Sequence, residues 1–183
     1  MRTDYLQLVS TCMHHAVRDE MAHHRYAVPV PVESMIRAAG WKIVPVAVST
    51  APRFEAATLF PARIIVVNPH LSACAQRFAL AHEWMHVQYH GRHVSPNLPY
   101  HVHPYHDELE VEANAGAAEL LLPYEWFMDT AQALLHQPLP TAEALQAFMA
   151  TPEAARWAHQ AQVTRSVLRY HLVDCGWVAS ASG

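Results

Sequence analysis

The stretch from Cys74 to His90 constrains the fold more than any other part of the chain. It reads C-A-Q-R-F-A-L-A-H-E-W-M-H-V-Q-Y-H and contains no proline or glycine. Apolar residues occupy most of its helical circumference, as expected of a helix buried within a domain. Two small residues, Ala75 and Ala79, precede His82 on the same stripe and leave room for an open cleft. The stretch therefore predicts a buried helix with one face on a cleft.

Five residues of this helix, His82 to His86, form the pattern H-E-x-x-H. Residues four apart lie one above the other on a helix, so His82 and His86 can bind one zinc ion together. Glu83 lies about 100° further round and can reach a water molecule on the metal. The chain contains 15 histidines, so a chance match is the alternative and the pattern alone is a moderate signal.

A second helix is predicted from Asp107 to Leu122, and it offers a third ligand. Glu110 lies at the edge of the apolar face, where a carboxylate points inward and needs a partner. A metal held by His82 and His86 would be that partner. The other glutamates share one side of the helix and are interpreted as a solvated face: Glu108, Glu112 and Glu119.

Two histidines and one glutamate leave a fourth tetrahedral position for water, which is typical of a catalytic zinc site. Asn114, one turn after Glu110, is expected to orient a ligand from behind. The alternative is an ordinary acidic helix in which Glu110 reaches solvent.

The two helices together resemble the ImmA/IrrE family of metallopeptidases. The resemblance rests on R-F-A-L-A-H-E-W-M-H followed by E-x-E-A-N-A-G-A-A-E-L-L-L-P, and it is dense from about residue 64 to 126. It implies one zinc per chain on His82, His86 and Glu110, with Glu83 as the general base. Manganese is the alternative metal for such nitrogen and oxygen ligands. Met85 stands where many members carry glycine, which bears on the shape of the cleft.

The resemblance also implies a function: a zinc endopeptidase that cleaves a specific protein partner. The implied partner is a helix-turn-helix repressor in a bacterial, phage or mobile-element stress response. One alternative is a non-proteolytic regulatory or toxin–antitoxin binding module with the metal as scaffold. A purely structural zinc protein is the third. An oxyanion-stabilising residue is expected from the loop between the two helices, without a choice among Tyr100, His101, His103, Tyr105 and His106.

Length and composition predict a single domain over residues 1–183, with a core at about 28–136 and a C-terminal helical extension at about 141–178. The net charge of −4 and the lack of a basic tract argue against direct nucleic-acid binding. No apolar run is long enough for a membrane span, so a cytoplasmic protein without membrane contact is expected. The oligomeric state stays open.

The predicted fold class is α+β, with a small, mainly antiparallel sheet of three strands against a helical body. The strands are expected at 41–48, 56–60 and 63–68, with Pro45 either limiting the first to a sheet edge or splitting it. Residues 3–26 read as an amphipathic helix. Its histidines are expected at the surface, with a second metal site as the alternative: His14, His15, His23 and His24.

Overall fold

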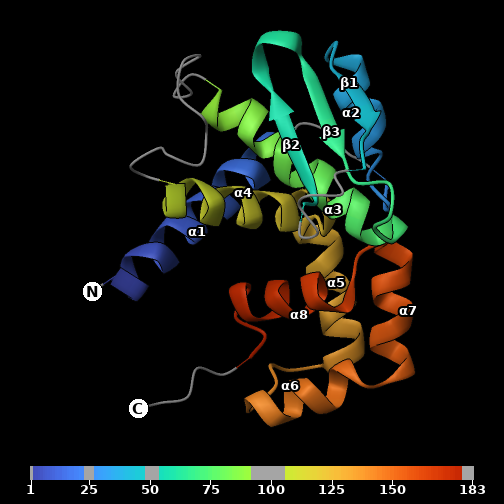
Figure 1. Ribbon diagram of the computed structural model, residues 1–183. Helices are drawn as coiled ribbons and strands as arrows, with labels where there is room; N and C mark the ends of the chain where they lie inside the picture. Colours follow the sequence, from blue (N-terminus) through green and yellow to red (C-terminus); the bar gives the residue numbers. More distant parts are fainter. Residues whose placement is uncertain (1, 23–26, 48–53, 92–105, 179–183) are drawn as a thin grey trace.

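The computed structural model describes residues 2–22, 27–47, 54–91 and 106–178, which form eight α-helices and three strands (Figure 1). The helices are α1 (Arg2–Ala22), α2 (Val32–Ala38), α3 (Ala73–Met85), α4 (His106–Leu121), α5 (Tyr124–Leu135), α6 (Ala142–Met149), α7 (Pro152–Ala161) and α8 (Arg165–Asp174). No helix in these ranges has the length and apolar character needed to cross a membrane. The predicted α+β class is confirmed.

The sheet contains β1 (Lys42–Pro45), β2 (Ala56–Leu59) and β3 (Ile64–Val67) in the order β1-β3-β2. β2 and β3 pair antiparallel, because only the short 3-10 turn η1 (Phe60–Ala62) joins them. β1 pairs with the far side of β3 in parallel. The sheet is therefore mixed, and the prediction of a mainly antiparallel sheet was wrong in that respect. Pro45 lies on the edge strand β1, as predicted.

Local sequence signals fix the helix boundaries in the C-terminal half. Thr141, Thr151 and Thr164 each accept a hydrogen bond from the backbone N–H three residues later, and so cap α6, α7 and α8. Ser72 caps α3 in the same way. Gly40 follows α2 with a φ of +79°, a conformation that glycine adopts without strain.

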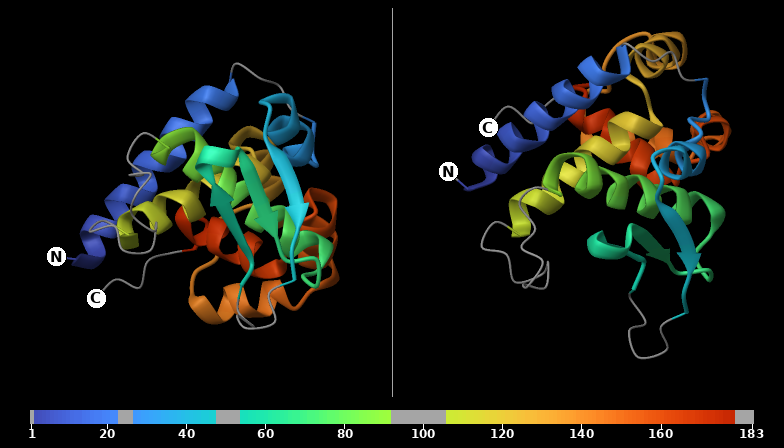
Figure 2. Two further views of the ribbon diagram at one scale, coloured as in Figure 1. Left: turned by 45° about the horizontal axis from the view of Figure 1, so that its top comes forward. Right: turned by 90° about the horizontal axis from the view of Figure 1, so that it is seen from above.

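The elements that carry the predicted site form layers. α3 packs against β2 and β3 on one side and against α4 on the other, while α1 covers the opposite side of α4. The right-hand view of Figure 2 shows this order, with the sheet and α1 at opposite ends of the stack. Helices α5 to α8 form the end of the molecule away from the sheet (Figure 1). Phe127 and Trp157 stack in the core of that end, with ring centroids 5.0 Å apart.

Helices α1, α3 and α4 approach one another closely at Gly116. A Cβ atom there would lie 2.7 Å from Met85 Sδ and 2.9 Å from Met13 Cε. Both methionines are buried. Met85 therefore points from α3 into the contact with α4 and does not line the cavity described below. Its size, which the sequence raised as a question of cleft shape, is accommodated by the missing side chain of Gly116.

Candidate metal centre and cleft

The helix α3 and the π-helical turn η2 (His86–His90) place the H-E-x-x-H residues. His82 and Glu83 lie in the last turn of α3, and His86 begins η2. His82 Nε2 and His86 Nε2 are 3.0 Å apart. Single π turns within α-helices occur frequently at functional sites because they re-aim side chains. Here both Nε2 atoms face the same point.

Glu110 of α4 completes the group, as the sequence predicted. Its carboxylate oxygens lie 3.2 Å from His82 Nε2 and 3.5 Å from His86 Nε2. Ligands at about 2.0–2.2 Å from a tetrahedral zinc ion are about 3.3 Å from one another. The separation of the two Nε2 atoms, 3.0 Å, and the distances of 3.2 Å to Glu110 Oε2 and 3.5 Å to Glu110 Oε1 are close to that value. The donor set and its spacing therefore fit a zinc ion, and the ligand roles themselves remain a prediction.

The far nitrogens of both histidines have partners that orient them. His82 Nδ1 lies 3.0 Å from Asn114 Oδ1, the contact expected from the spacing of Asn114 and Glu110. His86 Nδ1 lies 2.8 Å from His90 Nδ1, and His90 Nε2 lies 2.8 Å from Glu112 Oε2. These contacts orient both rings so that their Nε2 atoms face each other and Glu110.

The roles of His90 and Glu112 were not predicted from the sequence. Glu112 was interpreted as part of a solvated face, and that was wrong because its carboxylate bonds the buried His90 ring. The spacing His82, His86, His90 could have shown this, since it extends the histidine stripe by one more turn.

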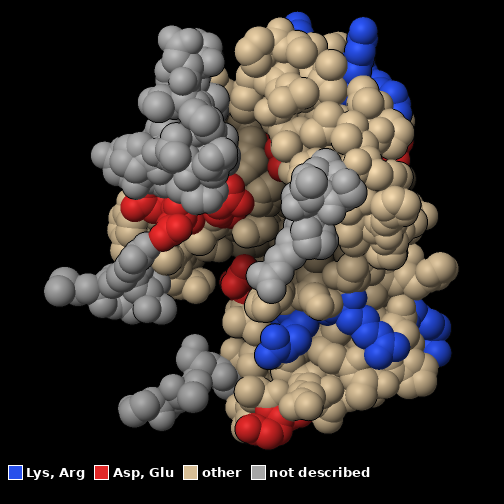
Figure 3. Space-filling model, viewed as in Figure 1, with Lys and Arg blue, Asp and Glu red and all other residues tan. Residues whose placement is uncertain are grey.

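Glu83 faces β2 and is held there by Thr58, a residue of that strand. The Thr58 hydroxyl donates a hydrogen bond of 2.7 Å to Glu83 Oε2. The cavity at this point has a volume of about 490 Å³. Residues 54–58 form one wall, and the three predicted ligands and Glu83 lie at its floor. Figure 3 shows the hollow on this face, with acidic side chains gathered where α4 begins.

Burial and mutual hydrogen bonds shift the pKa values of the ionisable side chains in the site. Burial alone would raise the pKa of Glu110, but hydrogen bonds from His82 and His86 hold it well below its usual range. Burial lowers the pKa of His86 to about 4. Burial also raises the pKa of Glu83, against the opposing hydrogen bond from Thr58. Glu110 is thus ionised beside a neutral His86. Burial lowers the pKa of His82, but the hydrogen bond to Glu110 and the charge of Glu83 outweigh it and raise that pKa, so a metal ion competes with a proton at His82.

The structure contradicts two further predictions, those for Glu119 and His14. Glu119 was assigned to the solvated face, and that was wrong because only 1% of its side chain is exposed. His14 was assigned to the surface, which was also wrong, since it is buried against Glu119. The candidate oxyanion residues Tyr100, His101, His103 and Tyr105 lie outside the described residues, as does the side chain of His106.

A helix bearing H-E-x-x-H, a glutamate from the next helix and an edge strand over the cleft define a metallopeptidase-like protein. Residues 42–172 match the family described as the IrrE N-terminal-like domain, a peptidase family. The chain belongs to this family. The comparison with curated proteins yields no match.

Proposed function

We propose that the protein is a zinc-dependent endopeptidase that hydrolyses peptide bonds in a specific protein partner. The observation that carries this is the convergence of His82 Nε2, His86 Nε2 and the Glu110 carboxylate within 3.0–3.5 Å, with Glu83 beside them in the lining of the cavity. The family resemblance adds a helix-turn-helix repressor as the partner, in a bacterial, phage or mobile-element response.

His82, His86 and Glu110 would hold the metal. When bound, zinc supplies positive charge that polarises a peptide carbonyl and makes water more acidic. Glu83 accepts the proton from the attacking water and passes it to the leaving amine. Burial raises the pKa of Glu83 and so makes it a stronger base. Thr58 holds its carboxylate on the cleft side of β2.

The position of β2 suggests how a substrate lies in the cleft. β2 is an edge strand, because its only partner in the described sheet is β3. The backbone N–H of Asn68 bonds the carbonyl of Glu55, so Glu55 and Ala57 direct their backbone groups toward β3. Ala56 and Thr58 consequently direct theirs toward the open edge. An extended peptide could add there as a further strand, with its carbonyls above the metal centre.

Proline substitutions on β2 test this binding mode. Ala56→Pro removes an N–H that faces the open edge and leaves the bonds to β3 intact. It should raise KM for a peptide substrate several-fold while unfolding at the wild-type temperature. Ala57→Pro is the matched control, because it removes a bond to β3 and should lower the unfolding temperature. Equal KM for wild type and Ala56→Pro would exclude strand addition at this edge.

The catalytic assignment is tested with Glu83→Gln. The variant should bind one zinc in the cleft as wild type does and lose cleavage by at least about a hundredfold, the scale of a general base. Glu110→Ala should lose that zinc and cleavage together. If Glu83→Gln inactivates the partner as well as wild type does, the protein acts by binding, and the endopeptidase proposal is wrong.

A further inference from the structure

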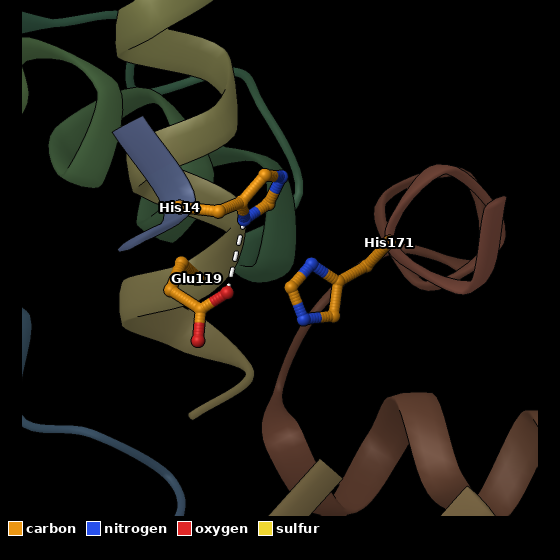
Figure 4. A group of neighbouring side chains, drawn as sticks. All are labelled: His14, Glu119 and His171. Carbon is orange, nitrogen blue, oxygen red and sulfur yellow. Dashed lines mark hydrogen bonds and ion pairs between the residues drawn. The ribbon is translucent and has the colours of Figure 1, made fainter. Parts of the chain in front are cut away.

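A second group of metal-ligating side chains lies outside the cleft, where α1, α4 and α8 meet. It consists of His14, Glu119 and His171, all buried. Each offers one ligand atom, and the three atoms lie within 4.8 Å of one another. Figure 4 shows the rings of His14 and His171 turned toward the Glu119 carboxylate from different helices. His14 lies outside residues 42–172, which match the family.

The most informative member is His171. Its ring is fully buried, and Nδ1 has no hydrogen-bond partner among the described residues. Nε2 lies 3.6 Å from Cys175 Sγ. If Nε2 carries the proton and points to the sulfur, the lone pair is on Nδ1 and faces the cluster. An unpaired buried polar atom loses its hydrogen bonds to water without replacement, so a ligand at this position would be stabilising.

We propose that His14, Glu119 and His171 form a second site for a divalent transition metal, with zinc as the best match to two imidazoles and a carboxylate. The ion would join α1 and α8 to α4, and its role would be structural. His14 Nδ1 and Glu119 Oε2 are already 2.9 Å apart, and ligand atoms on a tetrahedral zinc ion are about 3.3 Å apart. This inference does not depend on the peptidase proposal.

Without metal, protonated His14 links the carboxylates of Glu119 and Asp174 by hydrogen bonds. His14 Nδ1 and Nε2 lie 2.9 Å from Glu119 and 3.4 Å from Asp174, so both nitrogens donate to carboxylates. Burial lowers the pKa of His14, but the hydrogen bonds to Asp174 and Glu119 outweigh it and raise the pKa to about 9. Arg18 adds a 3.2 Å ion pair to Glu119, and the neutral His171 completes the surroundings.

A metal ion must displace this proton from His14. Its apparent affinity should therefore rise with pH, because a proton leaves for each ion bound. Glu119 needs no proton removed, since its hydrogen bonds from His14 and Arg18 outweigh burial and lower its pKa. Binding is best measured at pH 8, where the competition is weaker than at neutral pH.

The test is zinc content per chain by mass spectrometry. The full chain is stripped with chelator and re-equilibrated at pH 8 against zinc buffered with nitrilotriacetate, which suppresses weak binding to exposed histidines. Wild type should hold two zinc ions, and the variant His171→Leu should hold one. Leucine preserves the packing on Phe127, whose ring lies 4.5 Å from His171. His15→Gln, which changes the exposed neighbour of His14, is the matched control and should hold two.

A second arm separates the two sites. The variant His82→Gln/His86→Gln should hold one zinc, and adding His171→Leu should remove it. His14→Gln should lose one ion while its side chain can still bond Glu119. Zinc retained in full by His171→Leu, or none in the His82→Gln/His86→Gln variant with an intact circular dichroism spectrum, would overturn the second site. If that variant does not fold, the comparison of wild type with His171→Leu decides alone.

Discussion

Replacing Gly116 by alanine should change the free energy of unfolding through two opposing effects. Alanine favours a helix interior over glycine by about 1 kcal/mol, which would stabilise α4. The new Cβ, however, would lie 2.7 Å from Met85 Sδ and 2.9 Å from both Met85 Cγ and Met13 Cε. These separations are about 1 Å shorter than a comfortable contact of 3.5–4.0 Å.

The clash should outweigh the gain in helix propensity. Met85 is 3% and Met13 is 5% exposed, so neither side chain can swing into solvent. One contact is to Met85 Cγ, which cannot move without displacing the rest of the side chain. Overpacking of this kind costs about 1–3 kcal/mol. Gly116→Ala should therefore lower the free energy of unfolding by about 1 kcal/mol, and the unfolding temperature by about 2–4 °C for a chain of this length.

Urea unfolding followed by circular dichroism measures the effect, and two further variants separate its terms. Ala147→Gly on the exposed face of α6 gives the propensity term alone and should cost about 1 kcal/mol. Met85→Ala leaves a cavity that the new methyl group partly fills, so the double variant should be more stable than additivity predicts. A Gly116→Ala protein more stable than wild type would refute the proposed contact.

Three other predictions concern the site and the C-terminal helices. His90→Phe keeps the packing beside His86 but removes its partner, and should weaken cleft zinc affinity by about 10–100-fold in a competition titration. Thr164→Ala removes the α8 cap and should cost about 1 kcal/mol in urea unfolding. Burial raises the pKa of the Cys175 thiol to about 12, so iodoacetamide at pH 8 should label exposed Cys12 in the native protein and Cys175 only after unfolding, as read by peptide mass spectrometry.

The sequence was sufficient for the parts of the site that lie within one helix. The spacing of His82 and His86 requires only helical geometry, and the position of Glu110 on its helix selects it from its neighbours. The two helices then had only to pack for the atoms to meet, and they do so at 3.0–3.5 Å. Strand positions were also predictable, because the apolar runs are short and bounded by proline.

Features that depend on distant segments could not be read in this way. Glu119 shares a helix side with Glu108, yet α1 covers it and Arg18 and His14 bond it. Nothing in the spacing of α1 shows that it packs on α4. The parallel pairing of β1 with β3 is likewise decided by how the chain returns after β1, and an apolar run carries no information on strand direction.

α4 links the two clusters through its own geometry. Glu110 and Glu119 are nine residues apart, which turns them to opposite sides of the helix, about 180° apart and about 14 Å along its axis. One side meets α3 and the cleft, and the other meets α1 and α8. Between them lie mostly small residues, Ala113, Ala115, Gly116, Ala117 and Ala118, which let α3 and α1 approach closely. The close approach buries Glu119, whose side chain is 1% exposed, while Glu110 at the cleft is 34% exposed. Both carboxylates have histidine partners, and the same helix holds both in place.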